Sequence, residues 1–109
     1  MAARNPSGTT ARTTRKKALP KTLWSALGPL KVLFTAEGLD ADFGEFDYST
    51  RVIKVKPDLQ EAQKRHTLAH EWLHSVFWDA GIPKNVLTHE QEEQLCDVIA
   101  TALVASNLF

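Results

Sequence analysis

The sequence is short of cysteine and of long apolar runs. Its 109 residues include one cysteine, Cys96, which cannot form an internal disulfide bond. A single thiol of this kind is typical of proteins from a reducing compartment. No stretch approaches the roughly 18–20 consecutive apolar residues that a membrane-spanning helix needs, and no apolar segment of secretory type follows Met1. We therefore expect a cytoplasmic protein that has no membrane partner.

Acidic residues are absent from the first 21 positions, although the formal net charge of the whole chain is zero. Six of the thirteen basic residues fall in that segment, so the remaining positions hold seven basic and thirteen acidic residues. Residues 1–20 contain few apolar groups, and we predict that they form a disordered basic tail. Such a tail could contact nucleic acid or another polyanion weakly, and a solubilising leader is the alternative interpretation. Residues 21–109 are long enough for a single domain.

The first half of this domain has the residue pattern of a small sheet. Pro20 and Gly28-Pro29 bracket a short helix or turn. Beyond it, runs rich in branched and aromatic residues predict three strands, at residues 31–35, 44–48 and 51–56. The second and third runs are separated by a tight turn at Ser49-Thr50. We therefore expect a three-stranded antiparallel sheet.

The second half predicts two helices. Asp58 and Glu61 form a capping box that would open the first helix, and Gly81 followed by Pro83 would end it. Its wide apolar face should pack on the sheet, with its tryptophans in the core, at Trp72 and Trp78.

The second helix should open at Thr88, with Gln91 in the capping-box position, and run to the end of the chain. Its apolar residues follow the spacing i, i+3, i+4, i+7, i+8, at Leu95, Val98, Ile99, Ala102 and Leu103. The predicted fold class is therefore α+β, with the sheet packed on two main helices.

The run His70-Glu71-Trp72-Leu73-His74 has the H-E-x-x-H pattern of a zinc protease motif. Two histidines four residues apart lie on one face of a helix, so their ring nitrogens can reach one ion. Glu71 lies beside that ion without being needed as a ligand, and can take a proton from a metal-bound water. A helix that carries two unrelated histidines is the alternative interpretation.

A catalytic zinc site needs three protein ligands and one open position. The run Glu93-Gln94-Leu95-Cys96-Asp97 lies in the second predicted helix, and it begins nineteen residues after His74. Together with the H-E-x-x-H motif, it resembles the gluzincin zinc metallopeptidases, in which a Glu of an E-x-x-S/A-D/N pattern on the next helix supplies the third ligand. The resemblance covers about residues 66–100. The predicted order of three strands followed by two helices is similar to that of minimal members of the family, including ImmA/IrrE-like and phage-encoded peptidases.

The resemblance implies a minimal zincin-like domain in which His70, His74 and Glu93 hold one Zn²⁺ per chain. It also implies a peptide or protein substrate that lies extended along an edge of the sheet. Larger gluzincins have a C-terminal domain that supplies a His or Tyr to stabilise the oxyanion. In this chain the candidates for that role are Tyr48 and Arg51.

Asp97 follows Glu93 by four residues, so the two side chains face the same way on a helix. If Glu93 reaches the metal, Asp97 can accept a hydrogen bond from the free ring N–H of His70. The alternative for these acids is a solvated helix start, which the helix dipole favours. Glu92 and His89 are the other candidates for the third ligand.

Two further residues lie near the motif. Cys96 could ligate zinc or oxidise as a thiolate, but a small buried apolar role is commoner for a free cysteine. His66 lies one turn before His70 and is expected to be a solvated residue of the first helix.

These observations predict a zinc metallopeptidase in which Glu71 is the general base. The alternative is a zinc-stabilised, non-catalytic binding or regulatory protein whose basic tail contacts nucleic acid. A purely structural zinc site has no need of a base, so Glu71 favours the enzyme.

Overall fold

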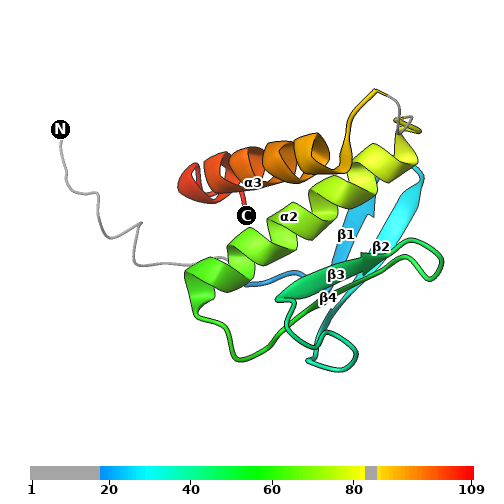
Figure 1. Ribbon diagram of the computed structural model, residues 1–109. Helices are drawn as coiled ribbons and strands as arrows, with labels where there is room; N and C mark the ends of the chain where they lie inside the picture. The colour runs from blue at the N-terminus through cyan, green and yellow to red at the C-terminus, as the bar shows by residue number, and fades with distance from the viewer. Residues whose placement is uncertain (1–17, 83–85) are drawn as a thin grey trace, which may run out of the picture.

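The computed structural model describes residues 18–82 and 86–109 of the chain (Figure 1). Residues 1–17 of the predicted basic tail, and Pro83, lie outside the described part. The elements are β1 (Thr22–Ser25), β2 (Gly28–Phe34), β3 (Gly44–Asp47), β4 (Val52–Val55), α2 (Glu61–Asp79) and α3 (His89–Ala105). The α+β class is therefore confirmed.

The helix α2 lies across one face of the sheet, and α3 lies on the far side of α2 (Figure 1). Among the described elements, α3 contacts α2 alone. The position of α3 therefore depends on the contacts that its side chains make with α2. Neither described helix is long and apolar enough to cross a membrane.

The sheet has four strands and mixed direction, so the prediction of three antiparallel strands is wrong. The strand order is β1-β2-β4-β3, with β1–β2 and β3–β4 antiparallel and β2–β4 parallel. Residues 35–43 connect β2 to β3 without placing β3 next to β2, and the side chain of Leu39 in this connection is buried. The next strand, β4, forms a hairpin with β3 and lies between β3 and β2. It therefore runs parallel to β2, and β3 lies at the edge of the sheet.

The extra strand, β1, occupies residues that the sequence assigned to a short helix or turn. Its pairing with β2 closes at Ser25 and Gly28. Gly28 has a φ of 138°, which is strained for any residue with a side chain. Gly28 therefore allows the tight hairpin between β1 and β2. The prediction failed because a Gly-Pro pair is also typical of the end of a helix.

Alternate residues of the central strands build the main core. Those of β2 and β4 that face α2 are almost fully buried together with Leu68 of α2, namely Leu30, Val32, Ile53 and Val55. Burying each such side chain contributes about 1.5–3 kcal/mol before the cost of ordering the chain is subtracted. Leu19, which precedes the first strand, also packs on this core. The part of the chain that packs on this core therefore includes residue 19.

The start of α2 differs from the prediction. The capping residue is Gln60, whose side chain makes no capping hydrogen bond, so the capping box of Asp58 and Glu61 is wrong. Leu59 instead packs against the core and holds the chain where the helix begins. The end is as predicted, because α2 stops at Asp79 and Gly81 follows with a φ of 68°.

The capping box of α3 is confirmed, with Thr88 accepting from the Gln91 N–H and the Gln91 side chain accepting from the Thr88 N–H. The helix ends at Ala105 and does not run to the end of the chain. Asn107 has a φ of 61°, and the chain turns back so that Phe109 packs against Trp72, with ring centroids 5.5 Å apart.

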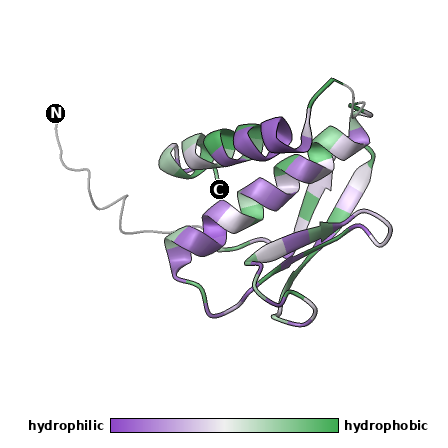
Figure 2. Ribbon diagram, in the orientation of Figure 1, coloured by the Kyte–Doolittle hydropathy of each residue, from purple (hydrophilic) through white to green (hydrophobic). Residues whose placement is uncertain are grey.

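The helix α3 turns small residues toward α2. Cys96 and Ala100 are fully buried against Ala69 and Leu73, and small side chains let two helices approach closely. The apolar stripe that the spacing predicted lies mostly on the exposed side, including Leu95, Val98 and Ile99. Figure 2 shows α3 hydrophilic at its N-terminal end and hydrophobic further along.

Candidate metal centre

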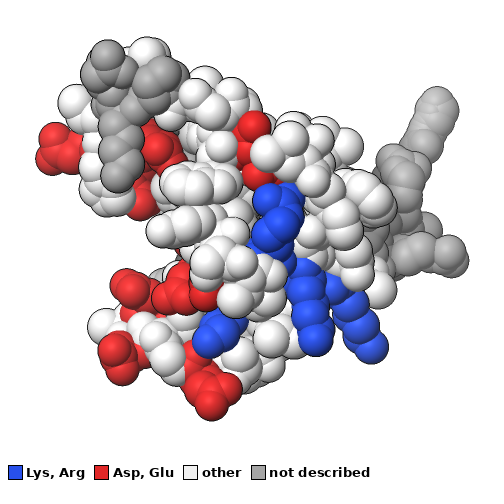
Figure 3. Space-filling model, turned by 90° about the vertical axis from the view of Figure 1, so that its right-hand side faces the viewer, with Lys and Arg blue, Asp and Glu red and all other residues white. Residues whose placement is uncertain are grey.

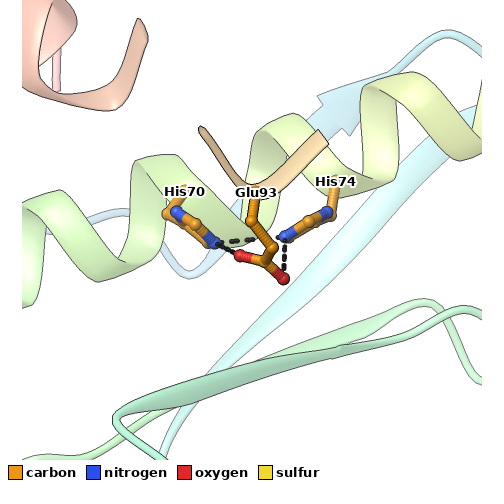
Figure 4. A group of neighbouring side chains, drawn as sticks. All are labelled: His70, His74 and Glu93. Carbon is orange, nitrogen blue, oxygen red and sulfur yellow. Dashed lines mark hydrogen bonds and ion pairs between the residues drawn. The ribbon is translucent and has the colours of Figure 1, made fainter. Parts of the chain in front are cut away.

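His70 and His74 lie on adjacent turns of α2 and point their Nε2 atoms toward the same place (Figure 4). The two Nε2 atoms are 3.1 Å apart. The carboxylate of Glu93, from α3, lies against both, with Oε1 2.9 Å from the His70 Nε2 and Oε2 3.4 Å from the His74 Nε2. The structure thus brings together all three residues that the sequence proposed as ligands.

The spacing of these atoms suits a shared ion. Ligand atoms at about 2.0–2.1 Å from a tetrahedral zinc are separated by about 3.3–3.4 Å. One ligand atom from each of His70, His74 and Glu93 lies within 4.8 Å of the others, and the closest separations are 2.9 and 3.1 Å. The measured separations of 2.9, 3.1 and 3.4 Å are therefore close to those expected if His70, His74 and Glu93 were to hold one ion.

The other ring nitrogens are held by two more carboxylates. The Nδ1 of His70 lies 2.8 Å from Asp97 Oδ1, and the Nδ1 of His74 lies 2.6 Å from Glu92 Oε2. A carboxylate accepts from a protonated Nδ1, which leaves the Nε2 of a neutral ring with a lone pair. Two lone pairs and the Glu93 carboxylate then face one another, an arrangement that a cation stabilises.

The contact between Asp97 and His70 is the one that the sequence predicted. Sequence reasoning missed the contact between Glu92 and His74, because it considered Glu92 only as a substitute for Glu93. Neighbouring residues on a helix point about 100° apart, so Glu92 and Glu93 reach different atoms of the same cluster. The signal was present in the sequence as two carboxylates side by side, but its meaning depends on where α3 crosses α2.

The remaining histidines lie at the margin of the cluster. His89 is almost fully exposed, and its Nε2 is 3.7 Å from Glu93 Oε2. His66 has its Nε2 4.0 Å from Asp97 Oδ1. Neither belongs to the set of atoms that converge between His70 and His74.

Glu71 lies between the helix and the edge strand β3, beside the two histidines. Burial raises the pKa of its carboxyl above the ordinary range, against the opposing charges of His74 and His70. A backbone hydrogen bond from Phe46 in β3 also holds this carboxylate. Gly44 makes the close approach possible, because a Cβ atom there would lie 2.6 Å from Thr67 Cγ2 and 3.4 Å from Glu71 Cγ.

One proposed ligand, His74, and one neighbouring side chain, Cys96, have altered pKa values. Burial lowers the pKa of His74, but the hydrogen bond to Glu92 and nearby carboxylates outweigh it, so the net shift is upward. Burial and the neighbouring carboxylates raise the pKa of Cys96 to about 12. Its Sγ, which is 3.7 Å from the His74 Nδ1, therefore stays a thiol and fills space between the helices.

A cavity of about 610 Å³ opens in front of the histidines, between β3 and the two helices. Six carboxylates line it and no Lys or Arg does, in the described residues: Asp42, Glu45, Glu71, Glu92, Glu93 and Asp97. On the face drawn in Figure 3, acidic side chains lie above and below a hollow, and most of the Lys and Arg side chains visible there lie to the right of it. The cavity therefore favours cationic groups.

The end of the cavity beyond His74 is aromatic. Tyr48 and Trp78 stack with ring centroids 4.2 Å apart, and Phe77 and Ile82 lie beside them in the lining. Trp78 is 51% exposed, so the prediction that it belongs to the core is wrong. Trp72 does pack against the core, and its Nε1 donates to the Trp24 carbonyl.

The two residues proposed to stabilise an oxyanion are placed differently. Tyr48 lines the cavity, whereas Arg51 is absent from the described lining. Both terminal nitrogens of Arg51 bind the Asp79 carboxylate at 2.9 Å. This guanidinium, with the Leu27 N–H, keeps the pKa of the buried Asp79 well below its usual range. Arg51 therefore joins the sheet to the end of α2 and does not face the candidate site.

A scan against protein-family models, a search of curated proteins and a search of solved structures each found no match to this chain. What the site can do must therefore follow from its own atoms.

Proposed function

We propose that this protein is a zinc-dependent metallopeptidase. The observation that carries the proposal is the convergence of His70 Nε2, His74 Nε2 and the Glu93 carboxylate beside Glu71, at the wall of an open cavity. Three ligands with space for a fourth are typical of catalytic zinc, whereas structural zinc is usually enclosed by four protein ligands.

Each residue has a chemical role in this proposal. His70, His74 and Glu93 would hold the ion, which when bound polarises a carbonyl and acidifies a water molecule. Glu71 accepts the proton of the attacking water and then delivers it to the leaving amine. Its raised pKa suits both steps, because a base that must also act as an acid works best when its pKa lies near the operating pH.

The edge of the sheet suggests how a peptide binds. The strand β3 ends the strand order, so one of its edges is unpaired in the described sheet. Three residues of β3, Gly44, Glu45 and Phe46, line the cavity. An extended peptide can add to this edge by main-chain hydrogen bonds, which places its carbonyls opposite Glu71. Tyr48 remains our candidate for the oxyanion stabiliser.

A zinc-stabilised protein without catalysis is the second candidate. The observation in its favour is that α3 contacts α2 alone among the described elements, so an ion bound by both helices would strengthen that contact. Glu71 argues against it, since this carboxylate faces the cavity and serves no ligand role.

The substitution Glu71→Gln separates the two candidates. The amide keeps the shape and the ligands but cannot accept the proton, so peptide cleavage should fall by about 10²–10⁴-fold while zinc content stays unchanged. Cleavage of a quenched peptide library and metal content by mass spectrometry would measure both. Glu90→Gln, an exposed position outside the cavity lining, is the matched control. Equal cleavage by Glu71→Gln and wild type would contradict the proposal.

A further inference from the structure

The aromatic end of the cavity is not explained by the packing of the protein. Tyr48 and Trp78 are 57% and 51% exposed, and neither they nor Ile82 belong to either hydrophobic core cluster. Their rings stack on one another, and the same residues line the cavity that contains the candidate metal ligands. Large apolar side chains held in place at the wall of a cavity form a binding surface for another apolar group.

The direction of β3 shows which part of a peptide would meet this surface. Gly44, at the start of β3, lies beside Thr67 and Glu71 of α2. Tyr48, just after the strand ends, lies on Trp78 near the end of α2. The strand therefore runs from the side of Glu71 toward the aromatic pair, with His74 between them along the helix.

A peptide that adds to the free edge of β3 can run in either direction, and antiparallel pairing is the more stable. In an antiparallel peptide, the N-terminal part lies near Tyr48 and Trp78 and the C-terminal part lies near Gly44. Its residues on the N-terminal side of the cleaved bond therefore lie at the aromatic end, and the leaving amine lies toward Glu71.

We propose that Tyr48, Phe77, Trp78 and Ile82 form a specificity subsite for a large apolar or aromatic side chain on the N-terminal side of the cleaved peptide bond. This inference rests on the proposed function, because it needs a peptide held against a metal at His70 and His74. Trp78 is the principal wall, since it is the member of the stacked pair that belongs to α2, the helix that also carries His70 and His74. The subsite gives the substrate class that the metal centre alone does not define.

Peptide hydroxamates test the inference in the zinc-loaded wild-type protein without requiring turnover. A C-terminal hydroxamate binds zinc and places the peptide on the N-terminal side of the metal. We would compare acetyl-Ala-Ala-Phe-hydroxamate with acetyl-Ala-Ala-Ala-hydroxamate by calorimetry, and expect the Phe probe to bind at least about tenfold more tightly. In a second pair of probes, a malonyl hydroxamate group precedes Phe or Ala, so the peptide lies on the C-terminal side of the metal. This pair should show a smaller preference for Phe over Ala.

Variants identify the surface responsible. Trp78→Ala should remove the preference for the Phe probe, and Trp78→Phe should retain most of it because an apolar ring remains. Trp24→Ala is the matched control, since Trp24 is exposed but lies outside the cavity lining. Circular dichroism and zinc content of each variant would show that fold and metal are intact.

The outcomes distinguish this inference from the proposed function. Equal binding of the first two hydroxamates to zinc-loaded protein, or a preference that survives Trp78→Ala, overturns the subsite and leaves the metal centre intact. A larger preference in the second pair reverses the peptide direction and also overturns it. The expected preference without cleavage of any peptide by wild type supports an apolar subsite on the N-terminal side of the metal and counts against the peptidase.

Discussion

At the end of α2, Asp79 binds Arg51, and five and nine residues earlier His74 and His70 meet carboxylates from α3. Both clusters join α2 to another element through charged side chains. The Arg51 guanidinium satisfies both oxygens of Asp79 and also donates to the carbonyls of Pro29 and Gly28. That cluster is balanced, with one positive and one negative charge and four hydrogen bonds from the guanidinium.

The histidine cluster has the opposite character. Around two imidazoles it gathers Glu71, Glu92, Glu93 and Asp97, and none of the Lys or Arg residues that the structure describes lines the cavity there. Carboxylates that approach one another in partly buried surroundings repel, so such a cluster lowers the stability of a protein unless a cation binds. The comparison separates a charged pair that serves the fold from a cluster that, in our proposal, a bound cation completes.

The largest effect on folding should come from breaking the balanced pair. Arg51→Met leaves the Asp79 carboxylate, whose side chain is fully buried, without its cationic partner, while the Leu27 N–H still donates to it. We expect a loss of about 3 kcal/mol in the free energy of unfolding, the lower end of the range for such pairs because Arg51 is partly exposed. Urea denaturation of wild type and variant would measure the change.

The affinity for zinc is the control for that experiment, since Arg51 is absent from the cavity lining. It should be unchanged in the folded variant. A variant as stable as wild type, or one that loses zinc while folded, would show that the two clusters are not independent.

A smaller effect should follow from removing the carboxylates that hold the histidine rings. Glu92→Ala and Asp97→Ala keep all three proposed ligands but release the Nδ1 atoms of His74 and His70. Loss of such a partner weakens metal binding by about 10–100-fold. Glu92→Ala should have the larger effect, because its carboxylate is the less exposed and makes the shorter contact, 2.6 Å against 2.8 Å.

Competition with a chelator of known affinity would measure these losses. Asp97→Asn should be milder than Asp97→Ala, because an amide oxygen can still accept from His70. Glu90→Ala, in the first turn of the same helix, is the control for lost negative charge. An equal loss of affinity in Glu90→Ala would assign the effect to general electrostatics and not to the ring contacts.

The parts of the site that sequence reasoning located depend on one helix at a time. The pairs His70 and His74, and Glu93 and Asp97, each have a four-residue spacing, which fixes their relative direction wherever the helix lies. The α+β class and the Thr88 capping box follow from equally local patterns. Such features can be predicted correctly even when the predicted arrangement of the helices and strands is wrong.

The features that sequence reasoning missed depend on contacts between distant segments. The role of Glu92 requires the crossing of α3 over α2. The parallel pairing of β2 with β4 depends on residues 35–43, which place β3 one strand away from β2 and leave room for β4 between them. The apolar spacing of α3 did not reveal its buried face, because the face toward α2 consists of small residues and of acids that serve the histidines.

Metal content tests the central claim most directly. Wild-type protein, dialysed against trace zinc and measured by mass spectrometry, should hold about one zinc per chain, and a chelator should lower its melting temperature because ligands from both helices are released. The His70→Ala/His74→Ala variant should hold none and should melt at the same temperature with or without the chelator. Full zinc occupancy in that double variant, or none in wild type, would contradict a metal centre at this site.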